Sequence, residues 1–266
     1  MAKCYFYNED CIASMKRMQE KGFKVDLVLS SPPYNTGRPS NSKRSIENLE
    51  SRYDIHLDDM SDEEYAKWIT DIFNNFDKIL NENGVILWNV SYGNEKPNSM
   101  WLSLLSLLQN TNFMIAEMII WKKKSALPNN VSHNKLTRIT EPVFVICRKN
   151  EYKTFTANKQ VKSISSTGQK YYENVYNFIE AANNDGSCNL NKATYSSDLC
   201  VQLLEIYSKK DAIVYDPFMG TGTTAVACEK YGDENMICIG SELSEAQVNF
   251  SKERLFNLRS KTIKTV

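Results

Sequence analysis

Short apolar, β-branched runs alternate with stretches of helical periodicity along most of this 266-residue chain. Each run is short enough for a buried strand and is bounded by turn-forming residues. The runs lie at residues 4–9, 25–30, 85–91, 113–121, 141–149, 212–218 and 236–242. Strands that alternate with helices predict a mostly parallel sheet with helices on both faces. We therefore expect an α/β fold with a Rossmann-like sheet of seven strands.

The clearest helix is predicted within residues 61–84. Ser61 is placed as the N-cap, Glu64 completes a capping box, and Gly84 is the predicted end. Further helices are expected at residues 98–110, 197–209, 222–231 and 244–258. Runs 113–121 and 141–149 have no good helix between them, which predicts one antiparallel hairpin in the sheet.

Two segments do not follow this pattern. Residues 37–60 are polar and aperiodic, and we expect a long mobile loop there. Residues 150–193 are rich in Asn, Lys, Ser and Tyr, and we expect a small insertion on the sheet rather than part of its core. No internal repeat is present, so residues 1–266 are expected to form a single domain.

Composition narrows the class of protein only slightly. Lys plus Arg and Asp plus Glu both count 32, so a nucleic-acid partner must be argued from local basic clusters. The seven cysteines form no C-x-x-C pair and are expected to be buried, reduced thiols, as is typical of cytoplasmic proteins. The two histidines lie far apart, so no metal site is predicted. The start of the chain lacks a secretory signal and the longest apolar run is too short to span a bilayer, so no membrane association is expected.

The strongest local signal is the glycine-rich turn in "IVYDPFMGTGTTAVACEKYG", residues 213–232. An apolar strand ends at Asp216, turns through Gly220 and Gly222, and enters a helix whose first N–H groups are unpaired. The next strand ends in Glu242, which is suited to a ribose diol. This half of the chain is predicted to bind a nucleoside-containing cofactor.

The residues around the turn favour one class of nucleoside. No Gly-Lys-Ser/Thr triplet follows the turn, which argues against a nucleoside triphosphate. Ala225 fills the third glycine position of a dinucleotide site, and the Asp216 carboxylate would repel a pyrophosphate. That carboxylate suits the ammonium group of S-adenosylmethionine, and a nicotinamide-dependent oxidoreductase is the remote alternative.

A second unusual stretch is "LSSPPYNTGR", residues 29–38, where two prolines follow an apolar strand. Ligands of open parallel sheets bind outside the carboxyl ends of the strands. Ser31 is therefore expected to face the same crevice as Asp216.

"SSPPYN" followed by "DPFMGTGTT" resembles the amino-methyltransferases of DNA, and the order of the two motifs is similar to the β group of that family. "YNEDCIASM" (7–15) resembles the adenine-contact segment of the family, and "VILWNV", "ITEPVFVICRK" and "ATYSSDLCVQLLEIYS" match in order. "NLNK" before "ATYSSDL" departs from the family pattern around residues 193–196. The resemblance implies a methyltransferase catalytic domain with the S-adenosylmethionine-dependent fold, a target-recognition insertion at 150–193 and a DNA-facing loop at 37–60.

The resemblance also implies the site residues. The catalytic residues would be Ser31, Pro32, Pro33 and Tyr34. The S-adenosylmethionine site would include Asp10, Cys11, Ser31, Asp216, Pro217, Phe218, Gly220, Thr221, Gly222, Thr223, Thr224 and Glu242. The Ser31 hydroxyl and the Pro32 carbonyl would accept hydrogen bonds from the target amine, and Tyr34 would stack on a base flipped out of the duplex. Serine is too weak a base to remove the proton first, so we expect attack by the amine before its proton is lost to water.

In the family, serine at the first motif position is associated mainly with cytosine N4, which Ser31 therefore favours. The alternative is adenine N6, because the "YNTG" continuation also occurs beside the adenine-type Asp motif. The absence of a Pro-Cys dipeptide argues against methylation of cytosine C5. A non-catalytic nucleic-acid binder with the same fold is a third class.

A DNA-facing surface is expected from basic clusters beside the motifs. The DNA-binding residues would be Asn35, Arg38, Lys43, Arg44, Lys122, Lys123, Lys124, Lys153 and Lys159, within a basic stretch that also includes Arg148, Lys149, Lys162 and Lys170. Loop 37–60 is expected to become ordered over DNA. The expected partners are double-stranded DNA, a cognate restriction endonuclease and a second copy of the chain, in a cytoplasmic protein encoded by a bacterium or phage.

Overall fold

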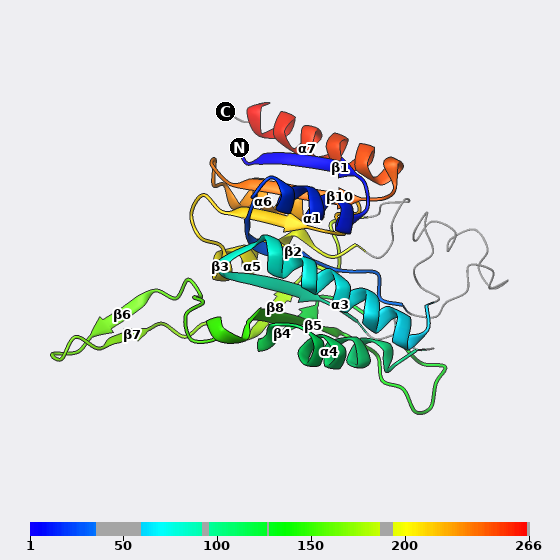
Figure 1. Ribbon diagram of the computed structural model, residues 1–266, viewed down its shortest axis with the longest axis horizontal. Coiled ribbons are helices and arrows are strands. Elements are labelled where there is room, and N and C mark those ends of the chain that lie inside the picture. Colours follow the sequence, from blue (N-terminus) through cyan, green and yellow to red (C-terminus); the bar gives the residue numbers. More distant parts are fainter. Residues whose placement is uncertain (36–59, 92–95, 127, 187–193, 265–266) are drawn as a thin grey trace.

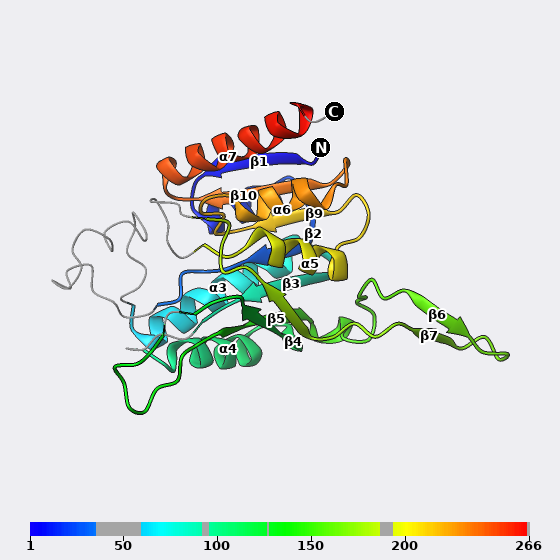
Figure 2. The same cartoon turned by 180° about the vertical axis from the view of Figure 1, so that it is seen from behind.

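The computed structural model describes residues 1–35, 60–91, 96–126, 128–186 and 194–264. Its centre is an eight-stranded sheet with helices on both faces (Figure 1). In spatial order the strands are β1 (Lys3–Asn8), β10 (Ile237–Glu242), β9 (Ile213–Asp216), β2 (Val25–Ser30), β3 (Leu80–Asn89), β5 (Thr140–Arg148), β4 (Phe113–Lys123) and β8 (Phe178–Ala181). A separate hairpin of β6 (Val161–Ile164) and β7 (Lys170–Tyr172) projects from the body (Figures 1 and 2).

The sheet is parallel from β1 to β3, and β5 runs antiparallel to both of its neighbours. The predicted α/β fold and the antiparallel pairing of β4 with β5 are therefore confirmed. The predicted count of seven strands is wrong, because β8 pairs parallel to β4. Strand β8 lies in the segment expected to stay outside the core, yet Ile179 and Ala181 are buried in it. A strand with only two inward-facing positions has no periodicity long enough to be recognised.

Helices cover the sheet in two layers with separate cores. One face is covered by α1 (Cys11–Glu20), α3 (Asp62–Ile79) and α4 (Ser99–Asn110). The other face, which is toward the viewer in Figure 2, is covered by α5 (Ser197–Tyr207) and α6 (Thr223–Tyr231). The last helix, α7 (Glu245–Lys264), packs along α6 and β1. Strand β2 supplies both cores, because Leu27 and Leu29 face one layer and Val28 faces the other.

The predicted helix at residues 61–84 begins as expected and ends earlier. Ser61 and Glu64 form both hydrogen bonds of the capping box. The helix stops at Ile79, and Gly84 lies inside β3 rather than at a helix end. Strand β3 bulges between the positions that pair with Val25 and Leu27, and a Cβ on Gly84 would lie 2.6 Å from the Leu80 side chain. The glycine is therefore explained by a strand bulge.

Helix α1 was not predicted, although residues 10–20 contain the signals for it. Asp10 is its N-cap and accepts hydrogen bonds from the N–H groups of Ile12 and Ala13. Its buried face includes Ser14 between Cys11 and Met15, so a polar residue interrupts a short apolar stripe. This interruption conceals the helical period.

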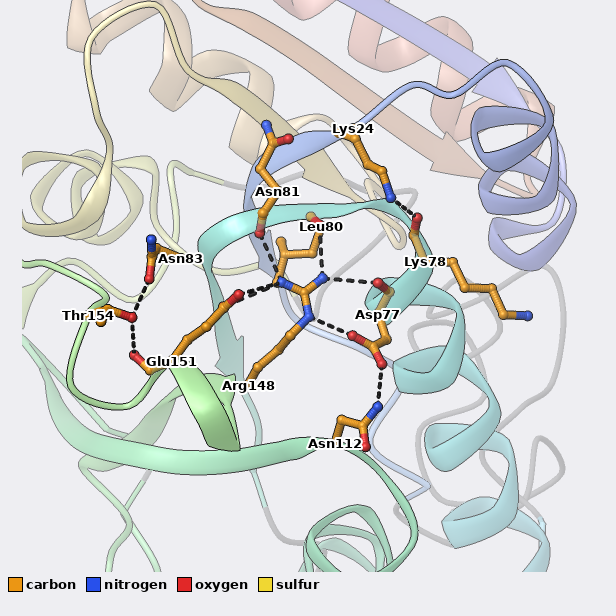
Figure 3. Close-up of polar contacts among 10 residues, drawn as sticks. All are labelled: Lys24, Asp77, Lys78, Leu80, Asn81, Asn83, Asn112, Arg148, Glu151 and Thr154. Carbon is orange, nitrogen blue, oxygen red and sulfur yellow. Dashed lines mark hydrogen bonds and ion pairs between the residues drawn. The ribbon is translucent and has the colours of Figure 1, made fainter.

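Arg148 joins the end of β5 to the junction between α3 and β3 (Figure 3). Its guanidinium makes ion pairs with Asp77 at 2.5 Å and Glu151 at 3.1 Å, and donates to the carbonyls of Asp77, Leu80 and Asn81. Burial opposes ionisation of Asp77, but the hydrogen bonds from Arg148 and Asn112 outweigh it, so the pKa of this carboxyl lies below its ordinary value. The inclusion of Arg148 in a DNA-facing stretch is therefore wrong, because its donors are used inside the fold.

The following three statements hold for the described residues. Six cysteines lie there as free thiols, and all except the half-buried Cys4 are buried. No group of three or more His, Cys, Asp and Glu side chains is arranged to hold a metal ion. None of the helices combines the length and the apolar character needed to cross a bilayer.

Candidate active site

The two sequence motifs meet at one edge of the sheet. Strands β2, β3, β9 and β10 run in the same direction, and their carboxyl ends are Ser30, Asn89, Asp216 and Glu242. The Ser31–Tyr34 corner directly follows β2, and the glycine turn directly follows β9, its neighbour in the sheet. The predicted catalytic and cofactor motifs therefore lie side by side at this edge of the sheet, which we call the catalytic edge after that prediction.

A chain of hydrogen bonds fixes the corner in a defined orientation. The Asn89 amide donates to the Pro142 carbonyl at 3.2 Å, which turns its Oδ1 toward Tyr34. The Tyr34 hydroxyl donates to that oxygen at 3.2 Å and lies 2.6 Å from the Ser31 hydroxyl. Because a tyrosine hydroxyl has one hydrogen, Ser31 is the donor in this last contact. The lone pairs of Ser31 remain suited to accepting a hydrogen bond.

The two prolines are buried, and their carbonyls differ in their contacts. The Tyr65 hydroxyl of α3 donates to the Pro33 carbonyl at 2.7 Å. Among the described residues, no hydrogen bond falls on the Pro32 carbonyl, which is the predicted acceptor for a substrate amine. Helix α3 thus holds the corner through one carbonyl and leaves the other available.

Asp216 is fully buried and joins the two motifs. Its carboxylate accepts hydrogen bonds from Ser30 and Thr224, each at 2.6 Å, and from the N–H of Phe218 at 3.0 Å. Burial outweighs these hydrogen bonds and raises the pKa of the Asp216 carboxyl to about 6. Both oxygens are therefore used within the protein, and the contact expected between Asp216 and a ligand ammonium stays a prediction.

The glycine turn is fixed by contacts to β10 and α7. The Glu242 carboxylate accepts hydrogen bonds from the N–H groups of Gly220 and Ser244, both at 2.9 Å. Gly222 has a φ of +79°, and a Cβ there would lie 2.9 Å from the Cβ of Ser251. The buried Thr221 hydroxyl has no hydrogen-bond partner in the described part of the chain. The turn is preformed, and one buried polar atom in it is unsatisfied.

An aromatic cluster connects the turn to the corner. The Phe218 ring lies 5.4 Å from Trp68 and 6.2 Å from Trp88, measured between ring centroids. Trp68 in turn lies 5.8 Å from Tyr65, whose hydroxyl holds Pro33. Packed rings therefore connect the glycine turn to the Ser31–Tyr34 corner, so a shift of one would displace the other.

The predicted adenine-contact residues lie at the same edge, because β1 is parallel to β10. Asp10 is exposed and caps α1, whereas Cys11 is buried and its thiol pKa is raised by that burial. The nearby Asn8 amide donates to the carbonyls of Glu242 and Leu243 at 3.0 and 2.8 Å. These contacts place Asp10 and Glu242 at the ends of adjacent strands.

The predicted DNA-binding residues at the catalytic edge differ in their availability. Asn35 is buried with a φ of +51°, and its amide donates to Ser99 and to the Met60 carbonyl. Lys122 is paired with Glu180 and Lys123 with Glu141, both at 2.5 Å. Lys124 is exposed.

Two further predicted DNA contacts, Lys153 and Lys159, lie at the opposite edge of the sheet. Strand β5 ends at Arg148 on the opposite edge, and Lys153 follows it there. Asn158, next to Lys159, donates to the carbonyls of Glu205 and Ser208 near the end of α5, which precedes the start of β9. Arg38, Lys43 and Arg44 lie outside the described residues, as do residues 37–59 of the predicted loop 37–60.

Four residues of the site were not predicted from the sequence: Ser30, Tyr65, Asn89 and Tyr195. The Tyr195 hydroxyl lies 2.7 Å from that of Thr224, so the "ATYSSDL" segment also contacts the Asp216 cluster. A polar residue at the carboxyl end of an apolar strand was the signal available for Ser30 and Asn89. The two tyrosines had no comparable signal, because each lies on a helix or loop far along the chain from its partner.

A single protein-family model covers both sequence motifs. The N6/N4 methyltransferase family model, described as DNA methylase, matches residues 25–253. The type II methyltransferase M.BglII of Bacillus subtilis is 24% identical over 268 residues, which cover 94% of this chain and 68% of M.BglII. M.SmaI of Serratia marcescens, also a type II methyltransferase, is 31% identical over 153 residues, or 57% of this chain and 50% of M.SmaI.

Several solved structures share the fold. The M1.HpyAVI–SAM complex has a TM-score of 0.63 at 22% identity and covers 95% of this chain and 100% of that chain. The PvuII DNA methyltransferase, described as cytosine-N4-specific, has a TM-score of 0.68 at 16% identity and covers 96% and 86%. At these identities the likeness establishes the fold.

Proposed function

Because this chain belongs to the DNA methylase family, we propose that it transfers a methyl group from S-adenosylmethionine to an exocyclic amine of double-stranded DNA. The observation that carries this proposal is the convergence of the Ser31–Tyr34 corner and the glycine turn at one sheet edge, joined by the Ser30–Asp216 hydrogen bond. Adjacent positions at this edge would hold the methyl donor and the target amine side by side.

The residues of the turn suit an adenosine-containing cofactor. Glu242 and Asp10 stand at the ends of adjacent strands, where carboxylates can accept hydrogen bonds from a ribose or an adenine. The unsatisfied Thr221 hydroxyl is a buried donor within the turn. S-adenosylmethionine, when bound, supplies an electrophilic methyl group. The protein residues then hold and orient the amine that receives it.

The corner is built to activate an amine. An exocyclic amine of a base is a poor nucleophile, because its lone pair is conjugated with the ring. Acceptors aimed at its two hydrogens favour a tetrahedral nitrogen, and Ser31 is an acceptor because its own hydrogen is donated to Tyr34. The Pro32 carbonyl would accept the second hydrogen. A new N–CH₃ bond then forms as the methyl–sulfur bond breaks, and the surplus proton leaves the nitrogen for water.

We propose cytosine N4 as the target, because Ser31 occupies the first motif position. The alternative is adenine N6, favoured by the "YNTG" continuation. The PvuII enzyme, whose structure is similar, is described as cytosine-N4-specific. A neutral serine acceptor suits both amines chemically, so identification of the methylated base decides between the two targets.

Several roles around the site belong to the same proposal. Residues 150–193 are proposed to contribute to target recognition, with Lys153 and Lys159 at the opposite edge contacting DNA that extends past the protein. A cognate restriction endonuclease and a second copy of the chain are proposed partners.

Methyl transfer to DNA tests the proposed activity. The protein is incubated with tritiated S-adenosylmethionine and unmethylated, PCR-amplified duplex DNA, and label in the DNA is counted. We expect label with the wild-type protein and a loss of about 100-fold or more with Ser31→Ala, since removal of one preorganised electrostatic group costs that much. A calorimetric titration with S-adenosylmethionine and with NAD is the control, and binding of NAD alone would overturn the proposal.

A further inference from the structure

The loop between β4 and β5 projects from the catalytic edge. We call its residues 128–139 the β4–β5 finger. Its base is closed by a 2.8 Å hydrogen bond from the N–H of Lys123 to the Ile139 carbonyl. Three residues after Ile139, the Pro142 carbonyl holds the Asn89 amide of the catalytic hydrogen-bond chain. In Figures 1 and 2 the finger lies on the side toward which the arrowheads of β3 and β9 point, and the β6–β7 hairpin projects on the other side.

Internal hydrogen bonds join the two sides of the finger and fix its tip. The Asn129 N–H donates to the Thr137 hydroxyl at 3.0 Å, and the Asn129 amide donates to the Lys135 carbonyl at 3.2 Å. These bonds cross the finger, so residues 130–136 form its tip. Within the tip, the Ser132 hydroxyl donates to Asn134 at 2.9 Å.

The tip exposes two aliphatic side chains to solvent. Val131 is 96% exposed and Leu136 is 88% exposed, more than any other large apolar residue in the described part of the chain. Packing in a hydrophobic core therefore does not explain why these two positions are apolar. Apolar side chains at the tip of a polar loop are suited to contact with bases in a groove or in an opened stack.

The positive charge of the finger indicates an anionic partner. Residues 128–139 contain Lys135, Arg138 and His133 and no Asp or Glu, although the whole chain has equal numbers of acidic and basic residues. Lys135 is exposed, in contrast to Lys122 and Lys123, which are paired with glutamates. A basic loop with an apolar tip complements DNA, because DNA combines negatively charged phosphates with flat apolar bases.

We propose that the β4–β5 finger enters a groove of the duplex beside the target base, with Val131 and Leu136 against the bases and Lys135 on a phosphate. This inference rests on the proposed function. It adds a DNA-contacting surface that lies outside the Ser31–Tyr34 corner and the glycine turn. The finger would help to hold the duplex open while the target base occupies the catalytic corner.

Two variants of the full-length protein test the proposal. Lys135→Gln is compared with Lys210→Gln, which alters an exposed lysine just before β9 at the opposite edge. Affinity for a short fluorescein-labelled duplex is measured by anisotropy over a series of KCl concentrations. We expect Lys135→Gln to weaken binding and to reduce the slope of log K against log[salt] by about one, with no change for Lys210→Gln.

The apolar tips are tested by Val131→Ser combined with Leu136→Ser. The matched control is Leu105→Ser on α4 with Phe256→Ser on α7, two residues that are 54% and 69% exposed and lie outside the proposed DNA-contacting segments. We expect kcat/KM for methylation of PCR-amplified duplex to fall about tenfold for the tip variant, with unchanged melting temperature and S-adenosylmethionine affinity, and no fall for the control. Wild-type rates and salt slopes in the tip and Lys135 variants would overturn the inference while leaving methyl transfer by the wild type intact. A wild-type protein that methylates no DNA would instead overturn the proposed function.

Discussion

The Ser30 hydroxyl donates a 2.6 Å hydrogen bond to the carboxylate of Asp216, a residue 186 positions later in the chain. Ser30 ends the strand that precedes the Ser31–Tyr34 corner, and Asp216 ends the strand that precedes the glycine turn. The two motifs are therefore fixed relative to each other before any ligand arrives. This relationship assigns Asp216 a structural role whose consequences can be measured.

Asp216→Asn is expected to change how stability depends on pH. Burial raises the pKa of Asp216 from 3.8 to about 6 in the folded protein. Between these values the unfolded chain has lost the proton and the folded protein retains it, so the free energy of unfolding falls as pH rises through this window. The shift corresponds to about 3 kcal/mol. Urea denaturation of both proteins between about pH 4 and pH 6 should show this fall in the wild type and a smaller one in Asp216→Asn; equal falls would contradict the account.

Asn89 is expected to control turnover through the orientation of Ser31. Asn89→Leu removes the acceptor for Tyr34, which frees the Tyr34 hydrogen and reverses the donor role of Ser31. We expect kcat to fall about tenfold, in line with the loss of a buried hydrogen bond, with little change in the affinity for DNA.

Asn89→Asp is the informative partner variant. It keeps an oxygen facing Tyr34 and loses the amide that donates to the Pro142 carbonyl. If orientation of Ser31 matters, Asn89→Asp retains more activity than Asn89→Leu. If Asn89 only anchors β3 to β5, Asn89→Asp is at least as impaired, which is the contrary result.

The features that could be predicted from the sequence are those encoded by neighbouring residues, whereas contacts between distant residues could not be predicted. The capping box of Ser61 and Glu64 is local, and the start of α3 was predicted correctly from it. Gly84 was misread, because a bulge paired with β2 depends on a partner strand that no local window contains. The motif residues were found because they are consecutive, whereas Tyr65 reaches Pro33 across 32 positions. Contacts of that kind become visible only when the fold is known.

Gly222→Ala is expected to disrupt the cofactor turn. The left-handed backbone costs about 1–2 kcal/mol for alanine, and the new Cβ would lie 2.9 Å from the Cβ of Ser251 on α7. Gly168→Ala is the matched control, since Gly168 has a φ of +84° and open space around it. Calorimetry should show a loss of S-adenosylmethionine affinity for Gly222→Ala alone. Equal affinities for the two variants would count against a rigid, preformed turn.

Arg148→Met is expected to destabilise the fold without any specific effect on DNA binding. It leaves the largely buried carboxylates of Asp77 and Glu151 without their ion-pair partner (Figure 3). Breaking a buried pair costs about 3 kcal/mol or more. Lys153→Met, at an exposed position of the same segment, should change the free energy of unfolding by less than about 0.5 kcal/mol. Chemical denaturation measures both, and a stability of Arg148→Met equal to that of the wild type would refute the structural role.

The central claim is that the Ser31–Tyr34 corner methylates an exocyclic amine of DNA. The most direct measurement is mass spectrometry of nucleosides from PCR-amplified duplex DNA treated with S-adenosylmethionine and either the wild-type protein or Ser31→Ala. The account predicts N4-methylcytosine with the wild type and a strong reduction with Ser31→Ala. N6-methyladenine would overturn the proposed target base, and the absence of any methylated nucleoside would contradict the claim itself.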